Sequence, residues 1–262
     1  MFETLEIARD GPIATLWMNR PDRHNAFNAQ VIAELTQAFG LLADNESARV
    51  IVLAGRGKSF SAGADLNWMK AAGEASFEDN LADARKLAAM LRRLAEMPKP
   101  TIARVHGAAL GGGMGLAAAC DICVAAKDAS FATSEVRFGL IPSAIGPYVL
   151  RAIGARQASR YFLTAERIDA RKALEIGLAH EVVEEDELHQ TVATLAEALL
   201  AGGPQAQGAA KALIRDMAGQ SIDDSLAEET ARRIAVLRGG GEAWEGLSAF
   251  LDKRPPRWGL IG

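Results

Sequence analysis

Four glycines, Gly111, Gly112, Gly113 and Gly115, form the stretch of this sequence best suited to chemistry. Glycine-rich turns let a backbone approach a ligand closely, and the small residues that follow, 114–119, predict a helix. The first amides of a helix have no partner within it and lie at the positive end of its dipole. The stretch therefore predicts a site for negative charge, either permanent as on a phosphate or transient as on an oxyanion.

A second stretch, residues 59–66, is also built for close backbone approach, with Gly63 between two alanines. It follows a short apolar run at 49–55, and the glycine cluster follows a similar run at 101–105. Ligands of open α/β sheets bind at the carboxyl ends of the strands, so we expect the two stretches to face each other across a crevice. Two backbone amides from different loops are what an oxyanion hole requires.

Other glycine-rich motifs do not match. The cluster has no Lys-Ser/Thr pair of a P-loop and no G-x-G-x-x-G with an acidic residue at the expected distance. A G-x-S-x-G nucleophile elbow is also missing. These gaps disfavour nucleotide binding and serine acyl transfer.

Cys120 and Cys123 form a C-x-x-C spacing, which has two interpretations. One is a redox pair or half of a metal site. The other is two small buried apolar residues at the junction of a helix and a strand. The sequence has no second cysteine pair to complete a metal site, so we favour the buried residues.

The surrounding pattern predicts the elements that hold these loops. A hairpin is expected over 5–19 around Asp10-Gly11-Pro12, and Asn28 is expected to cap the next helix. An amphipathic helix is predicted over 77–96. Strands are expected at 49–55, 101–105, 122–125 and 130–133, which together with the helices indicates a mostly parallel sheet. After about residue 143 helical periodicity dominates, at 148–163, 169–176, 187–200, 205–217 and 222–237.

Composition limits the class of protein. The chain has 262 residues, of which 49% are hydrophobic and 24% charged, and a net charge of −4, which argues against a nucleic-acid partner. No apolar run is long enough for a membrane span. The acidic N-terminus lacks an apolar signal core, so we expect a cytoplasmic protein.

Three segments resemble the enoyl-CoA hydratase/isomerase (crotonase) superfamily, namely residues 60–66, 106–116 and 130–142. The resemblance extends from the first hairpin to Phe250 and Lys253. It implies an α/β fold, a crotonase-like spiral of ββα units with a helical C-terminal trimerisation region, assembled as a homotrimer or a dimer of trimers. We expect a core domain over 1–200 with the CoA and acyl site, and a helical region over 201–262.

The resemblance also implies the chemistry. The substrate would be an acyl-CoA thioester, with coenzyme A as part of the substrate and neither a separate cofactor nor a metal. By match of position, the amides of Ala64 and Gly112 would bind the thioester oxygen, and Glu135 would transfer protons. Preorganised donors of this kind act on the charge of the enolate as it develops, and removing one costs about 3 kcal/mol.

Further positions match residues that contact coenzyme A in the family. They fall in three groups: a loop lining the CoA channel, backbone groups at the adenine end, and a neighbouring subunit's cover over CoA. The loop residues are Arg23, Asn25 and Ala26, and the residues at the adenine end are Ala62, Asp65 and Leu66. The residues that would cover CoA from a neighbouring subunit are Phe250 and Lys253.

One position departs from the family pattern. Hydratases of the family commonly carry a second glutamate in the first turn of the glycine-started helix, where this chain has Gly115. Hydration needs a group that activates water and a proton donor for the α-carbon, so Glu135 would have to serve both steps. The single carboxylate resembles both Δ3-Δ2-enoyl-CoA isomerases and bacterial methylglutaconyl-CoA hydratases of leucine catabolism.

We favour a hydratase acting on 3-methylglutaconyl-CoA or another branched 2-enoyl-CoA, in fatty-acid or leucine catabolism. The segments 25–30, 61–69, 133–140 and 145–148 resemble the methylglutaconyl-CoA hydratases more than the isomerases. The isomerase is the alternative. A third possibility, from a different class, is a non-catalytic relative that binds acyl-CoA or RNA, although the acidic balance argues against RNA.

Four further residues have both a functional and a structural interpretation. Arg137 would pair with the distal carboxylate of a dicarboxylic acyl group, or with a carboxylate of the fold. Trp68 and Met69 would wall the acyl pocket beside Gly115, or belong to the core. For His106 we favour a structural hydrogen bond over a role in the site.

Overall fold

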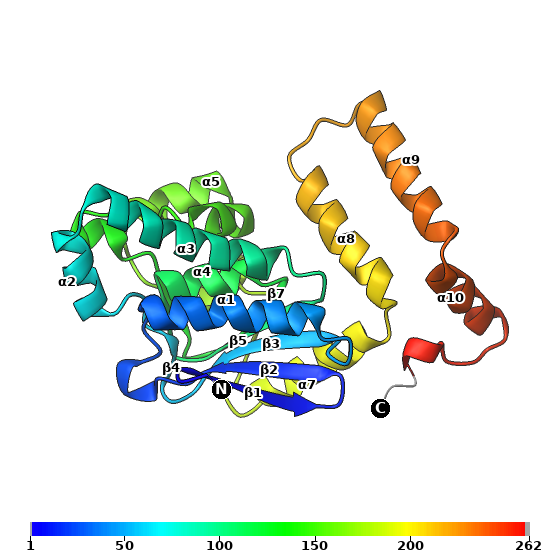
Figure 1. Cartoon of the computed structure of the whole chain (residues 1–262), viewed down its shortest axis with the longest axis horizontal. Helices are drawn as coiled ribbons and strands as arrows, with labels where there is room; N and C mark the ends of the chain where they lie inside the picture. The colour runs from blue at the N-terminus through cyan, green and yellow to red at the C-terminus, as the bar shows by residue number, and fades with distance from the viewer. Residues whose placement is uncertain (1, 260–262) are drawn as a thin grey trace.

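The computed structural model describes residues 2–259, beginning with the predicted hairpin (Figure 1). β1 (Leu5–Asp10) pairs antiparallel with β2 (Ile13–Met18), and alternate residues of β2 are buried. α1 (Ala29–Asp44) begins at Asn28, whose side chain accepts a hydrogen bond from the Val31 amide at 2.9 Å. This is the predicted cap, which satisfies one of the free amides of the first turn.

After α1 the chain repeats one pattern: a strand in a large sheet, a strand in a small sheet, and one or more helices. The three repeats are β3 (Val50–Gly55), β4 (Ser59–Ser61), α2 (Leu66–Glu74) and α3 (Phe77–Ala95); β5 (Thr101–Val105), β6 (Ala108–Leu110) and α4 (Gly112–Ala119); and β7 (Ile122–Ala126), β8 (Ser130–Ala132), η2 (Glu135–Phe138) and α5 (Gly146–Thr164). The predicted spiral of ββα units is confirmed.

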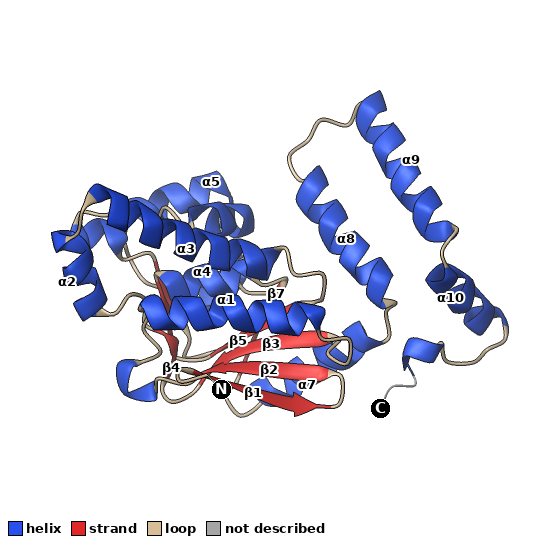
Figure 2. Cartoon of the chain, viewed as in Figure 1, coloured by secondary structure: helices blue, strands red, loops and turns tan. Residues whose placement is uncertain are grey.

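The large sheet has the strand order β1-β2-β3-β5-β7-β10, where β10 is Glu181–Val183, and all its pairs beyond β1–β2 are parallel. The small sheet has the order β4-β6-β8-β9, where β9 is Ile168–Asp169 and leads into α6 (Ala170–Glu175). α1 and α3 cover one face of the large sheet, and α7 (Leu188–Leu200) covers the other (Figure 2). Both faces are therefore buried, as the all-apolar β3 requires.

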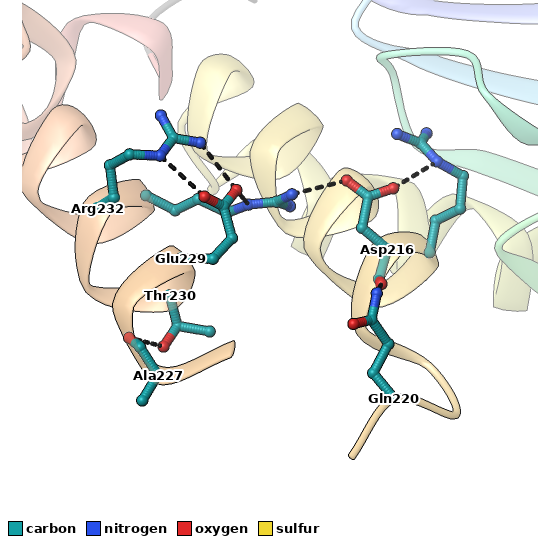
Figure 3. A network of polar contacts seen from close by, with 8 residues as sticks. Asp216, Gln220, Ala227, Glu229, Thr230 and Arg232 are labelled. Carbon is teal, nitrogen blue, oxygen red and sulfur yellow. Dashed lines mark hydrogen bonds and ion pairs between the residues drawn. The ribbon is translucent and has the colours of Figure 1, made fainter. Parts of the chain in front are cut away.

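The last helices, α8 (Pro204–Met217), α9 (Asp224–Arg238) and α10 (Gly241–Leu251), extend away from this body and end in η3 (Arg257–Gly259) (Figure 1). The Lys211 ammonium fixes α8 to the body through the Asp121 carboxylate at 2.6 Å and the Lys99 carbonyl at 2.7 Å. Between α8 and α9, Arg233 bridges Asp216 and Glu229, which also binds Arg232 (Figure 3). The helical C-terminal region is therefore present. The predicted division at residue 200 stays a prediction, and its outer limits, Met1 and Gly262, lie outside the described residues.

Several elements differ from the expectation. β4, β6, β10, α2 and α10 were not expected, and β4 occupies the start of the stretch taken as a loop over 59–66. α2 is only nine residues long and has no buried side chain, so its periodic signal in the sequence is weak. The helix expected over 148–163 begins at Gly146 and is kinked at Gly154, where φ is +73°. Across residues 2–259, no helix is long and apolar enough to cross a membrane.

Candidate active site

The segment around Ala64 is held by the loop before α1. The Phe27 amide donates to the Gly63 carbonyl at 2.6 Å, and the Asp65 amide donates to the Phe27 carbonyl at 2.8 Å. These two hydrogen bonds clamp the backbone on either side of Ala64. Within residues 2–259 the Ala64 amide itself donates to no acceptor, so it is available to a ligand.

The glycine cluster packs against the same segment. A Cβ on Gly112 would lie 2.6 Å from Cε2 of Phe27, one on Gly113 would lie 2.5 Å from the Ser61 carbonyl oxygen, and one on Gly63 would lie 3.0 Å from the Leu110 carbonyl oxygen. Since real Cβ atoms do not approach other atoms so closely, glycine is required at 113 for the contact between the two loops and at 112 for the contact with Phe27. The two predicted loops therefore lie against each other, and the crevice between them stays a prediction.

Gly111 sets the direction of the first free amide of α4. Its φ of +47° and ψ of −116° lie outside the regions open to residues with a side chain, and its own amide donates to the Ala132 carbonyl at 2.8 Å. Its ψ angle orients the next peptide group, which carries the Gly112 amide. As the first residue of α4, Gly112 donates to no acceptor in the described chain. The structure thus brings together the two segments that carry the predicted donors.

Glu135 opens η2 and points its carboxyl at the glycine cluster. A Cβ on Gly111 would lie 3.2 Å from Oε1 of Glu135, while Oε2 is buried and has no hydrogen-bond partner in residues 2–259. Burial raises the pKa of the Glu135 carboxyl above its ordinary value, against a smaller opposing effect of its own backbone amide. A carboxyl with a raised pKa, beside free amides that suit a negative charge, is equipped to exchange protons with a bound carbonyl compound.

The buried Glu135 carboxylate also costs stability. Because its pKa is higher in the folded than in the unfolded state, the free energy of unfolding is greatest below the unfolded pKa of about 4.3 and falls as the pH rises through the raised value. Glu135→Gln removes the charge and keeps the shape. We expect its melting temperature at neutral pH to exceed that of the wild type by about 2–4 °C, the shift that roughly 1 kcal/mol gives in a chain of this size.

Scanning calorimetry against pH checks this expectation. The difference in melting temperature between the two proteins should shrink towards pH 4 as the wild-type carboxyl becomes protonated. A constant difference across the pH range would mean that charge burial at Glu135 is not its cause.

Gly115 lies one turn into α4, against Ile145. A Cβ on Gly115 would lie 2.3 Å from Cγ2 of Ile145, so the space beside Gly115 is filled by a buried apolar side chain. In the sequence, Ile145 belonged to the segment 145–148 that resembles the methylglutaconyl-CoA hydratases, and no signal connected it to Gly115. The structure shows that no larger residue fits at 115 while Ile145 keeps this position.

Residues 23–26, predicted to line a CoA channel, belong to a loop over 20–26 that Asn25 holds from inside. Asn25 adopts φ +54° and is 1% exposed; its Oδ1 accepts from the Arg20 amide at 2.8 Å, and its Nδ2 donates to the Arg56 and Ser59 carbonyls. Its amide group is therefore occupied within the protein, and it positions the loop. Ala26 is also buried, whereas Arg23 is exposed.

The predicted contacts at the adenine end lie on one short segment before α2. The Ala62 amide donates to the His24 carbonyl at 2.9 Å, and the Asp65 side chain caps α2 through the Asn67 amide at 3.0 Å. Burial raises the pKa of the Asp65 carboxyl, but this cap and the Arg20 guanidinium at 3.3 Å outweigh it, and the pKa is lowered. Leu66 is exposed.

The residues predicted to line the acyl pocket or to cover CoA lie in three different places: against the core, on the surface and at a distant helix. Trp68 is part-buried against the main core, and its indole Nε1 donates to Asp83 at 3.2 Å; Met69, on the same helix, is also part-buried. Arg137 is exposed and makes no ion pair with the described residues. Phe250 and Lys253 lie at α10, on the far side of the molecule from α2 (Figure 1), so they do not reach the site of their own chain.

Two structural interpretations are confirmed. His106 Nε2 bonds to the Gly57 carbonyl at 2.8 Å. Cys120 and Cys123 are free, buried thiols, and burial raises the pKa of Cys123 to about 12, which disfavours the reactive thiolate. Among residues 2–259 no group of His, Cys, Asp and Glu side chains is arranged to hold a metal ion.

Comparison with known proteins agrees with this geometry. The family model described as enoyl-CoA hydratase/isomerase matches residues 8–260. The short-chain-enoyl-CoA hydratase of Clostridium acetobutylicum is 34% identical over 254 residues, which cover 95% of this chain and 94% of that protein. The crystal structure of an enoyl-CoA hydratase from Shewanella pealeana superposes with a TM-score of 0.96 at 43% identity, covering 98% of this chain and 97% of the other.

Proposed function

Because the chain belongs to the enoyl-CoA hydratase/isomerase (crotonase) family, we propose that it adds water across the double bond of a 2-enoyl-CoA thioester. It is an enzyme of the hydratase type. The observation that carries the proposal is the part-buried Glu135 carboxyl, with a raised pKa and a buried oxygen free of partners, beside the free amides of the glycine helix.

The proposed reaction uses two groups of this chain. The amides of Ala64 and Gly112 donate to the thioester oxygen, and Glu135 takes a proton from water as the water oxygen bonds to C3. The electron pair of the C2–C3 double bond moves towards the thioester oxygen, giving an enolate that the two amides stabilise. Glu135 then returns the proton to C2, so that one water is added and no separate cofactor is consumed.

Within this class we propose 3-methylglutaconyl-CoA or another branched 2-enoyl-CoA as substrate, in leucine or fatty-acid catabolism. The motif segments at 61–69 and 133–140 support this choice. Arg137 also supports a dicarboxylic acyl group, because it lies two residues from Glu135 and its cation is unpaired among the described residues. A guanidinium matches a carboxylate in shape and charge.

One observation favours the alternative, an isomerase that moves a double bond from C3 to C2. Ile145 fills the space beside Gly115, so an apolar side chain stands where a second acid or base would act. In that reaction Glu135 alone suffices: it removes a proton from C2 and returns it to C4, and no water is added.

A mass-spectrometric assay in ¹⁸O water separates the two reactions. The protein is given 3-methylglutaconyl-CoA, crotonyl-CoA and a 3-enoyl-CoA. We expect the 2-enoyl esters to gain one labelled water. Conversion of the 3-enoyl ester without labelling would instead establish the isomerase, and tight binding without turnover of any ester would establish a non-catalytic acyl-CoA-binding relative.

We further propose that the chain assembles as a trimer or a dimer of trimers, in which Phe250 and Lys253 cover CoA bound to a neighbouring copy. Trp244, Leu247, Phe250 and Leu251 of α10 are each at least 60% exposed, which supports an apolar contact with another chain. Light scattering should give three or six times the mass of one chain. A monomer at micromolar concentration would contradict the assembly.

A further inference from the structure

A cavity of about 220 Å³ lies between α2 and α3. The α2 side of the cavity is formed by side chains at helical spacing that are apolar and mostly small, and the α3 side is mainly polar. The lining residues are Trp68, Ala71, Ala72 and Ala75 on the first side, and Asp79, Asn80, Ala82, Asp83 and Lys86 on the second.

Two hydrogen bonds join α2 to α3 across the cavity, beside the part-buried Trp68. α2 has no buried side chain. Asn80 Nδ2 donates to the Ala72 carbonyl at 2.9 Å, and the Trp68 indole donates to Asp83 Oδ2 at 3.2 Å. The three alanines are too short to fill the space that these bonds span, and they leave an apolar surface facing charged groups.

The chain links the cavity to the proposed reaction site through the first turn of α2. α2 begins directly after Asp65, and Trp68 lies in its first turn. Four residues of chain separate Trp68 from Ala64 and span at most about 14 Å. Trp68 both lines the cavity and packs against the core cluster that contains Ile145. An acyl chain whose thioester oxygen is bound at Ala64 therefore has Trp68, and behind it the cavity, within reach.

The cavity carries negative charge. Asp79 and Asp83 contribute two carboxylates against one ammonium, that of Lys86, which lies 3.4 Å from Asp83 Oδ1. Asp83 is two-thirds buried, while Lys86 is largely exposed. Arg137 does not line this space. A carboxylate entering the cavity would meet like charge with no free cation to offset it.

We propose that Asp83 is a specificity-determining residue, whose charge makes the enzyme reject acyl groups that end in a carboxylate near Trp68. The inference rests on the proposed function. It applies to acyl chains long enough to enter the cavity behind Trp68, and it is separate from the proposed pairing of a short dicarboxylic acyl group with Arg137. The alanine face of α2 binds the apolar part of such a chain, and Trp68 holds the Asp83 carboxylate at its edge.

The test compares esters that differ only at the far end of the acyl chain. These are trans-2-octenoyl-CoA, the CoA thioester of trans-2-octenedioic acid, and the methyl ester of that diacid's free carboxyl. We expect the wild type to show a kcat/KM about tenfold or more higher for the two uncharged esters than for the diacid, as like charges at a partly buried site produce.

Asp83→Asn isolates the charge, because an asparagine oxygen still accepts the hydrogen bond from Trp68. In this variant we expect kcat/KM for the neutral esters to exceed kcat/KM for the diacid by only about threefold or less. Gly73→Ala is the matched control on α2: its added Cβ meets no atom within 4 Å, and it should keep the wild-type ratio. Higher salt should narrow the wild-type ratio as well.

The results test the inference about Asp83 and the proposed hydration separately. A wild type that prefers the diacid, or a ratio that Asp83→Asn leaves unchanged, overturns the inference and leaves hydration intact. If no ester is hydrated, crotonyl-CoA included, the proposed function fails. The inference about Asp83 is then tested by calorimetry, which compares the affinities of the protein for octanoyl-CoA and octanedioyl-CoA. Equal affinity for the two, or binding of neither, overturns the inference in that case.

Discussion

Glu135→Gln is expected to lower kcat for hydration by about 10²- to 10⁴-fold, the contribution that a positioned general acid or base makes. Glutamine keeps the volume and the polar oxygen beside Gly111 but cannot take a proton from water. Since the proposed mechanism assigns binding of the thioester oxygen to the amides of Ala64 and Gly112, affinity for a saturated acyl-CoA should stay within a few-fold. Steady-state rates and calorimetric binding measure the two effects separately.

The pH profile gives a second measure of the role of Glu135. As a base, its carboxyl must be ionised, and burial raises its pKa. The acidic limb of kcat/KM in the wild type should therefore lie above the ordinary glutamate value of about 4.3 and should be missing from the variant's residual rate. Glu166→Gln, which changes an exposed carboxylate paired with Arg160, is the control. Turnover of Glu135→Gln near the wild-type rate would remove Glu135 from the mechanism.

Gly111→Ala is expected to lower kcat by about 10²- to 10³-fold, the loss that follows removal of one oxyanion donor. The φ and ψ angles at Gly111 are closed to alanine, so the peptide group that carries the Gly112 amide must rotate. The new Cβ would also lie 3.2 Å from Oε1 of Glu135. Rotation of one peptide group and displacement of the carboxyl act on the same bound thioester.

The control for Gly111→Ala is Gly219→Ala, between α8 and α9. Gly219 also has a positive φ, +79°, and its added Cβ meets no atom within 4 Å. Both variants should lose a similar amount of stability to backbone strain, about 1 kcal/mol, but only Gly111→Ala should lose activity. Equal losses of activity would mean that strain, and not the orientation of the Gly112 amide, is responsible.

Much of the fold follows from local sequence signals. The turn at Asp10-Gly11-Pro12 predicted the hairpin, Asn28 predicted the start of α1, and the stripe of α3 predicted that helix. Each signal reflects an interaction between residues close together in the sequence. The strands of the small sheet, such as β4 and β6, have only three residues, too few to show a period of two. α10 was missed because glycines at 239–241 indicate the end of a helix, and here they precede one.

The features of the site that depend on backbone conformation could be predicted from the sequence. Those that depend on side-chain contacts between distant residues could not. Glycines at 63 and 111–113 indicated close approach, and the structure shows two loops in contact there. That Asn25 holds the loop over 20–26, and that Ile145 fills the space beside Gly115, depends on residues tens of positions apart meeting in space. No periodicity or spacing in the sequence encodes such contacts. The contact between Ile145 and Gly115 leaves no room for a second carboxylate at position 115.

The contact between Gly115 and Ile145 also constrains how the sequence can change over generations. A larger residue at 115 collides with Ile145 while Ile145 keeps its position, and a smaller residue at 145 alone leaves a cavity in the core. The two positions therefore exchange residues in a fixed order: 145 must shrink first, at a cost in stability, before a side chain can enter at 115. A lineage is thus held at one carboxylate by epistasis between two neighbours, even where a second carboxylate would be of use.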